Sequence, residues 1–232
     1  TYPTPTTIDT FYTDANGQLV TPERMEYVKG DSLVEVQASY RYVRDSTPVY
    51  FDVAEEHSSD EGGITVIKVD KPNMAQKGTV SIEKTGEVFS GVNISGVENA
   101  DVIYQPVYEV KGLAGAVYEI SAAEDIITPD GTLRYAKGEV VDTVTTDENG
   151  LAKSKELYLG KYTVVEITAP EGMVINKEAH DVELTYAGQE VSVTETATSF
   201  VNDRQKVAVS LEKTIEKNDI FNIGNGDEMK NI

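Results

Sequence analysis

Apolar and polar residues alternate along most of this 232-residue chain. The alternating stretches are rich in valine, isoleucine, tyrosine and threonine, and turn dipeptides such as Asn16-Gly17, Asn149-Gly150 and Ala187-Gly188 separate them. An alternation with a period of two puts every second side chain on the same face of a β-strand, and a helix would need a longer period. The sequence therefore predicts an all-β chain.

Three pairs of similar strings recur along the chain, with offsets between 129 and 133 residues. Such spacing is the signature of an internal repeat. The pairs are TIDTFYTDANG at 7–17 with VVDTVTTDENG at 140–150, YVKGDSLVEVQASYRYV at 27–43 with YLGKYTVVEITAPEGMV at 158–174, and VSIEKT at 80–85 with VSLEKT at 209–214.

The repeat divides the chain into serial modules. Residues 1–75 are predicted to hold the later strands of a first module, residues 76–205 a complete module, and residues 206–232 the start of a third. The string KPNMAQKG at 71–78 has the composition of a junction between the first two modules.

Composition excludes several functions. Forty acidic and twenty basic residues give a formal charge of −20, which disfavours binding to nucleic acid or to anionic membrane surfaces. The chain has no cysteine, so disulfides, thiolate metal sites and cysteine nucleophiles are absent. No apolar run is long enough to span a membrane, and no signal peptide is evident, so we expect any targeting or anchoring segment to lie outside this sequence.

Three polar residues are predicted to share strand faces with apolar neighbours. Lys84 continues the row of Val80 and Ile82, Glu166 that of Tyr162 and Val164, and Asn202 that of Phe200. One interpretation is a salt bridge at the sheet edge, with Asn202 bonded to the backbone. The other is a reaction, because a buried lysine loses its charge easily and a desolvated carboxyl tends to stay protonated.

Four strings together resemble the Cna-B modules of Gram-positive pilins and adhesins. They are VSIEKT at 80–85, GLAGAVYEI at 112–120, YTVVEITAPEGM at 162–173 and SFVND at 199–203. The resemblance implies serial prealbumin-like (SpaA-like, Ig-like) β-sandwich modules. It also implies an autocatalytic isopeptide bond in which Lys84 attacks the side-chain amide of Asn202 and ammonia leaves.

The resemblance places Glu166 at the catalytic position of the family. There it would give a proton or a hydrogen bond to the amide oxygen and accept the proton lost by the amine. The act is a single turnover, so we expect no enzyme and no cofactor. The expected function is that of a stalk or spacer module in a secreted surface protein, attached to the cell wall of a Gram-positive bacterium.

The chain departs from a minimal family member by an insertion at 86–111. This segment is expected to add a strand, a surface flap or a plain decorated hairpin. It also supports an alternative function, that of an adhesin module whose insertion contacts a host extracellular protein or glycan. Otherwise the expected partners are neighbouring modules of the same polypeptide.

The partial modules allow a weaker assignment of counterparts. Glu35 aligns with Glu166, and either Asp70 or Asn73 stands where the acceptor is expected. Lys213 aligns with Lys84 and is expected to remain a free amine, or to meet Asp70 or Asn73 of a neighbouring chain.

No metal site is expected. His57 and His180 lack metal-ligand spacing and are expected at the surface. The carboxylates of TDANG and TTDENG suit tight turns better than a Ca²⁺ site.

Overall fold

The computed structural model describes residues 6–22, 25, 29–53, 59–61, 64–96 and 102–212. Within them the secondary structure consists of strands and turns, without a helix, so the all-β prediction is confirmed. Lys213 and His57 lie outside the described residues.

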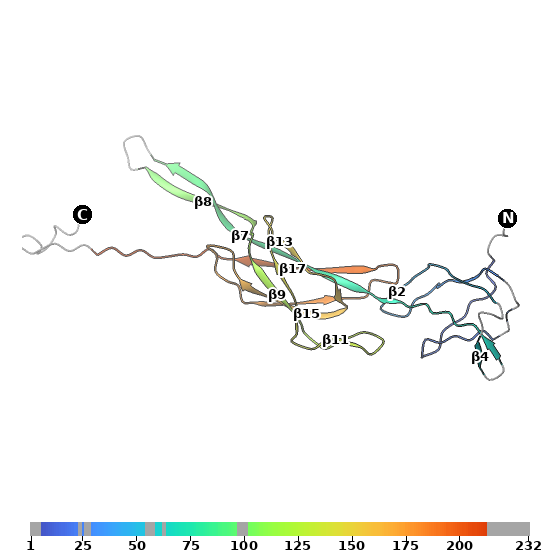
Figure 1. Cartoon of the computed structure of the whole chain (residues 1–232). Coiled ribbons are helices and arrows are strands. Elements are labelled where there is room, and N and C mark those ends of the chain that lie inside the picture. Colours follow the sequence, from blue (N-terminus) through green and yellow to red (C-terminus); the bar gives the residue numbers. More distant parts are fainter. Residues whose placement is uncertain are drawn as a thin grey trace, which may run out of the picture.

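Two β-sheets pack face to face between residues 77 and 202 (Figure 1). The first has the order β12-β9-β15-β16. In the second, β7 pairs with β13, β14, β17 and β8. The bounds are β12 (Val140–Thr145), β9 (Val117–Ala122), β15 (Gly160–Thr168) and β16 (Ala179–Leu184) for the first sheet, and β7 (Lys77–Ser95), β13 (Leu151–Lys153), β14 (Leu157–Tyr158), β17 (Val193–Asn202) and β8 (Ile103–Gly112) for the second.

The core lies between these sheets and is built from alternate residues of their strands. Tyr118 of β9, Tyr162 of β15, Ile82 of β7 and Phe200 of β17 are at most 1% exposed. The rings of Tyr118 and Phe200 meet across the core with their centroids 4.7 Å apart. The rows of apolar residues that the alternation predicts therefore point inward.

The first and last strands of this sandwich are neighbours and run parallel. Strand β17 follows β7 over ten residue pairs, with Phe200 opposite Lys84 and Asn202 opposite Gly86. Parallel neighbours need a long connection, and here the rest of the sandwich supplies it.

The insertion forms a two-stranded ribbon, in agreement with the hairpin interpretation. Strand β7 continues past the sandwich to Ser95 and pairs there with antiparallel β8. The ribbon projects from the end of the sandwich opposite to residues 6–75 (Figure 1). A smaller hairpin, β10 (Ile126–Ile127) with β11 (Leu133–Tyr135), decorates the side.

The described part of residues 6–75 contains only short strands. The pairs are β1 (Asp31–Leu33) with β3 (Val49–Phe51), β2 (Tyr42–Val43) with β6 (Met74–Ala75), and β4 (Ser59–Glu61) with β5 (Ile64–Val66). Large side chains such as Val36, Tyr40 and Tyr50 are more than half exposed. That these residues hold only the later strands of a module stays a prediction. The module limits themselves stay predictions.

One repeated string folds the same way in both copies. Asp14 and Asp147 each accept hydrogen bonds from the backbone nitrogens two and four residues ahead. Gly17 and Gly150 close the turns at φ of 73° and 77°. These backbone bonds lower the pKa of both carboxyls and account for their function as turn residues.

Candidate functional site

Lys84, Glu166 and Asn202 converge in the interior of the sandwich. Their exposed fractions are 0%, 1% and 3%. Lys84 Nζ donates a hydrogen bond to Asn202 Oδ1 and lies 3.4 Å from Glu166 Oε1. Asn202 Nδ2 donates to both carboxyl oxygens of Glu166 at 3.0 Å. The structure thus brings an amine, a carboxamide and a carboxyl group into mutual contact away from water.

Both sheets contribute to this cluster. Lys84 comes from β7 and Asn202 from β17, its parallel neighbour in the same sheet. Glu166 comes from β15 in the facing sheet and reaches across the core. The strand pairing fixes the amine beside the carboxamide, and the sheet packing holds the acid against both.

The backbone of Lys84 is held by two glycine-lined segments. Its nitrogen donates to Gly150 O at 2.7 Å, and its carbonyl accepts from Leu113 N at 3.0 Å. A Cβ on Gly150 would lie 2.2 Å from the Lys84 carbonyl oxygen, and one on Gly112 would lie 1.9 Å from the Asn149 carbonyl oxygen. The close approach of the 147–150 turn to β7 thus requires glycine at both positions.

Burial alters the protonation of the amine. Desolvation lowers the pKa of Lys84 below its ordinary value, while the charge of Glu166 opposes this shift. An amine in this position loses its proton more readily than an exposed lysine, and only the neutral form is a nucleophile.

Glu166 also contacts two groups that sequence reasoning missed. Asn176 N donates to Oε2 at 2.7 Å, and the Tyr118 hydroxyl donates to Oε1 at 3.5 Å. Desolvation, with Glu166 nearby, raises the pKa of Tyr118, so the phenol stays a donor. Tyr118 lies within the GLAGAVYEI string and on the inward face of its strand, which was the available signal. The contact of Asn176 is made by its backbone, and residue type gives no signal for that.

The orientation of the carboxamide differs from the expected one. Sequence reasoning directed Glu166 toward the amide oxygen, but both of its oxygens face the amide nitrogen, and the amide oxygen faces Lys84. The carboxyl group therefore lies beside the nitrogen that would leave in an amide exchange.

A related acid–amide contact exists among residues 6–75. Asn73 Nδ2 donates to Glu35 Oε2 at 2.7 Å and to the Val43 carbonyl at 3.1 Å. Of the two acceptors that the sequence left open, the structure brings Asn73 rather than Asp70 to Glu35. Both members of this pair are partly exposed, unlike Glu166 and Asn202.

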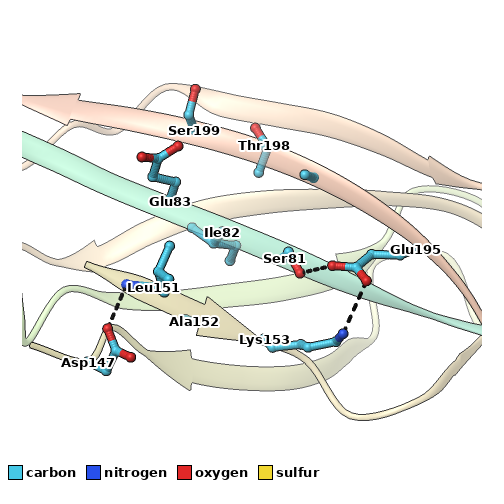
Figure 2. Close-up of a pocket in the computed structure, with 11 residues that line it drawn as sticks. Ser81, Ile82, Glu83, Asp147, Leu151, Ala152, Lys153, Glu195, Thr198 and Ser199 are labelled. Atoms are coloured by element: carbon cyan, nitrogen blue, oxygen red, sulfur yellow. Dashed lines mark hydrogen bonds and ion pairs between the residues drawn. The ribbon is translucent and has the colours of Figure 1, made fainter. Parts of the chain in front are cut away.

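A surface hollow lies on the outer face of the same strands (Figure 2). Ser81 donates to Glu195 Oε1, and Lys153 Nζ lies 3.2 Å from Glu195 Oε2. These contacts lower the pKa of Glu195, with the Ser81 hydrogen bond as the largest cause. The lowered pKa keeps this exposed carboxylate ionised, so it is a poor proton donor.

His180 does not lie freely at the surface as expected. It stacks on Phe200 with ring centroids 3.9 Å apart, and its Nδ1 lies 2.8 Å from Thr198 Oγ1. Among the described residues there is no group of three or more His, Cys, Asp or Glu placed to hold a metal ion. The same part of the chain contains no helix able to cross a membrane.

Comparisons with known proteins find similarity to part of this chain. Residues 106–198 match the family model of the SpaA prealbumin-like fold domain. The trypsin-resistant surface T6 protein of Streptococcus pyogenes serotype M6 is 31% identical over 86 residues, which are 36% of this chain and 16% of that protein. The chain therefore spans about a sixth of the length of this curated relative.

Two solved structures are similar to parts of this chain. The Bacillus anthracis TIE protein is 25% identical, with coverage of 75% of this chain and 24% of that chain, at a TM-score of 0.40. BcpA, the major pilin subunit of Bacillus cereus, is 23% identical, with coverage of 56% of this chain and 29% of that chain, at a TM-score of 0.31.

Proposed function

Residues 106–198 belong to the SpaA-like, Cna-B-type prealbumin-fold family, and we propose that the chain is a spacer in a Gram-positive surface stalk, closed by a Lys84–Asn202 isopeptide bond. One observation carries the proposal: an amine and a carboxamide touch in a dry interior beside a carboxyl group. The salt-bridge interpretation accounts for Lys84 and Glu166 but not for the carboxamide held between them.

The reaction begins with a proton transfer. Lys84 Nζ lies 3.4 Å from Glu166 Oε1, and a proton that passes from the ammonium to the carboxylate removes two charges from a medium that solvates them poorly. The result is a neutral amine and a neutral acid. The amine lone pair then attacks Cγ of Asn202.

The leaving group departs with the help of Glu166. The acid donates its proton to Nδ2 of the tetrahedral species, the C–N bond breaks, and ammonia leaves. The attacking nitrogen gives its surplus proton back to Glu166, so the acid is regenerated. One amide has been exchanged for another, and no oxidant, metal or cofactor enters the balance. The hydrogen bonds from Nδ2 to Glu166 support this role at the amide nitrogen.

The bond would join the first and last strands of the sandwich. It would enclose 118 residues, and closing a loop of that length stabilises a fold by about 5 kcal/mol in the chain-entropy account. The chain has no cysteine, so this amide would take the place that disulfides occupy in many exported domains.

A spacer function follows from the same bond. A module tied at both terminal strands resists unravelling by tension and by proteases. The S. pyogenes relative is described as a trypsin-resistant surface protein, and we propose the same location and resistance for this chain. The formal charge of −20 would keep neighbouring stalks apart in solution.

Intact-mass measurement tests the bond. We expect the purified protein to be lighter than its sequence by one ammonia, and a Glu166→Gln variant to have the full sequence mass. Glu178→Gln is the matched control, because Glu178 is exposed and lies outside the cluster, and this variant should lose ammonia like the parent. A wild-type protein of full sequence mass after prolonged incubation would overturn the proposal.

We further propose Glu35 and Asn73 as the acid and acceptor of the preceding module, whose lysine would lie before residue 1. Their contact at 2.7 Å repeats that of Glu166 with Asn202. A longer protein that includes the preceding strands should lose a second ammonia, and Asn73→Ala should prevent that second loss only.

A further inference from the structure

The β7–β8 ribbon has one apolar face. Paired residues share a face, and the pairs Phe89–Tyr108, Val92–Pro106 and Ile94–Tyr104 follow one another along the ribbon. Phe89 and Val92 are three residues apart, and a bulge between Phe89 and Gly91 restores their common orientation. The bulge thus keeps the apolar row continuous where simple alternation would have broken it. The opposite face is mixed, since its successive pairs are Val88–Glu109, Gly91–Val107, Asn93–Gln105 and Ser95–Ile103.

This face is uncovered in the described structure. Phe89 is 60% exposed, Ile94 68% and Tyr104 66%. A ribbon that projects from its sandwich cannot bury this surface against its own module (Figure 1). A continuous exposed apolar surface of this kind marks an interaction site.

The chain leaves the sandwich on the same face. The Arg204 guanidinium lies over the Tyr108 ring, 3.4 Å from its centroid, and pairs with Glu87 Oε2 at 3.0 Å. Glu87 lies two residues before Phe89 in β7, so both side chains lie on the same face of the ribbon. Gln205 N donates to Gly172 O at 2.8 Å. These contacts place Arg204 at the base of the ribbon, on the face that carries Tyr108.

The following residues are themselves apolar and uncovered. Val207, Val209 and Leu211 are 88–91% exposed and are separated by Ala208 and Ser210. They belong to the string that repeats VSIEKT, whose Val80 and Ile82 are buried in the sandwich. The ribbon and the chain that follows β17 both extend beyond the same end of the sandwich (Figure 1).

The preceding junction shows how modules of this chain dock. Arg41 donates to the Leu159 carbonyl, Ala38 N donates to Gln189 Oε1, and the Tyr40 and Tyr186 rings meet at 4.8 Å. Arg44 pairs with Glu190. The 131-residue offset that aligns Glu35 with Glu166 also aligns Arg41 with Gly172. The segment around Gly172, which Gln205 contacts beside the base of the ribbon, is thus the counterpart of the segment that makes these contacts.

We infer that the apolar face of the ribbon packs against the module that begins near residue 206, and so clamps the junction between the two modules. The partner is the same polypeptide, and its near end supplies the apolar surface that Phe89, Val92, Ile94 and Tyr104 require. The inference rests on the serial arrangement proposed above and not on the isopeptide bond.

Photo-crosslinking in a longer polypeptide that contains the complete following module tests this placement. p-Benzoylphenylalanine is introduced at Ile94 on the apolar face or at Gln105 on the opposite face, and crosslinked peptides are identified by mass spectrometry. We expect the probe at 94 to react within the same molecule with residues beyond 206, and the probe at 105 not to. Any of three results would overturn the inference: equal reaction from both positions, reaction only between molecules, or reaction only with an added host protein.

Proteolysis gives an independent measurement on the same polypeptide. Ile94→Thr with Tyr104→Thr should speed trypsin cleavage after Lys206 on the order of tenfold, because the lost apolar burial favours local opening. Asn93→Thr with Gln105→Thr is the matched control and should leave the rate unchanged. If neither double variant changes the cleavage rate while the intact mass still shows the lost ammonia, the proposed docking of the ribbon is wrong and the spacer function stands.

Discussion

The interior amine of Lys84 is the residue on which the chemistry depends. Full burial removes its solvation, and Glu166 is its charged neighbour at 3.4 Å. The sequence predicted this placement because Lys84 continues the inward row of Val80 and Ile82. The orientation of the Asn202 amide could not be predicted in this way, since alternation gives the face of a side chain but not its rotation about its own bonds.

A pH dependence follows for a protein that cannot form the bond. Desolvation lowers the pKa of Lys84, and Glu166→Gln removes the charge that opposes this shift. The folded state then binds fewer protons than the unfolded state, in which the lysine titrates near 10.5. The free energy of unfolding should therefore rise with pH, from the lowered pKa up to the ordinary one.

Urea unfolding of Glu166→Gln at several pH values from about 7 to about 10 measures this slope. The double variant Lys84→Met, Glu166→Gln lacks the amine and is the control for all other titrating groups. The difference between the two variants should shrink as pH rises. A constant difference would show that Lys84 is solvated in the folded state.

Strand β7 is the element that organises the module. It pairs with four other strands, supplies Lys84, and continues as one side of the ribbon. The repeat and the alternation predicted its inward row and its place at the start of a module. They could not predict that the same strand runs on to Ser95, because the bulge beyond Phe89 interrupts the alternation that marks a strand.

Gly150 connects the 147–150 turn to β7, and its replacement gives a prediction for this element. Gly150→Ala should lower the free energy of unfolding by about 2 kcal/mol or more, because a side chain is strained at positive φ and its Cβ would lie 2.2 Å from the Lys84 carbonyl. Bond formation should also slow, since the Lys84 backbone must shift.

Gly115→Ala separates the two effects. Gly115 has a similar φ of 83° but no atom within 4 Å of its added Cβ. It should show the strain of positive φ alone and form the bond at the normal rate. Thermal melts and the time course of ammonia loss compare the two variants. Equal losses of stability would mean that the turn can move away from β7 at no cost.

At the scale of the whole molecule, the parallel neighbours β7 and β17 decide how tension passes through the module. In the proposed stalk, force would enter at the start of β7 and leave at the end of β17, so the two parallel strands would be pulled in opposite directions and their ladder would be loaded in shear. A bond from Lys84 to Asn202 would carry the force directly between them. The ribbon and the other strands would then bear no load, and the ribbon would stay free to support the next junction.

Single-molecule stretching measures this effect. The wild-type module should not lengthen when pulled from its two ends. Asn202→Ala should release on the order of 400 Å of additional chain, because the 118 enclosed residues each span up to about 3.5 Å when extended. Asn93→Ala, which changes an exposed asparagine of the ribbon, should behave as wild type. A wild-type extension equal to that of Asn202→Ala would exclude a load-bearing bond.

The distance along the sequence between Lys84 and Asn202 also sets the timing of the chemistry. The two residues meet only when β17 takes its place beside β7, so a chain that is still being synthesised or threaded through an export channel lacks the acceptor. The module stays chemically open, and able to pass as an extended thread, until its last strand arrives. Loss of ammonia would then serve as a permanent record that folding has been completed.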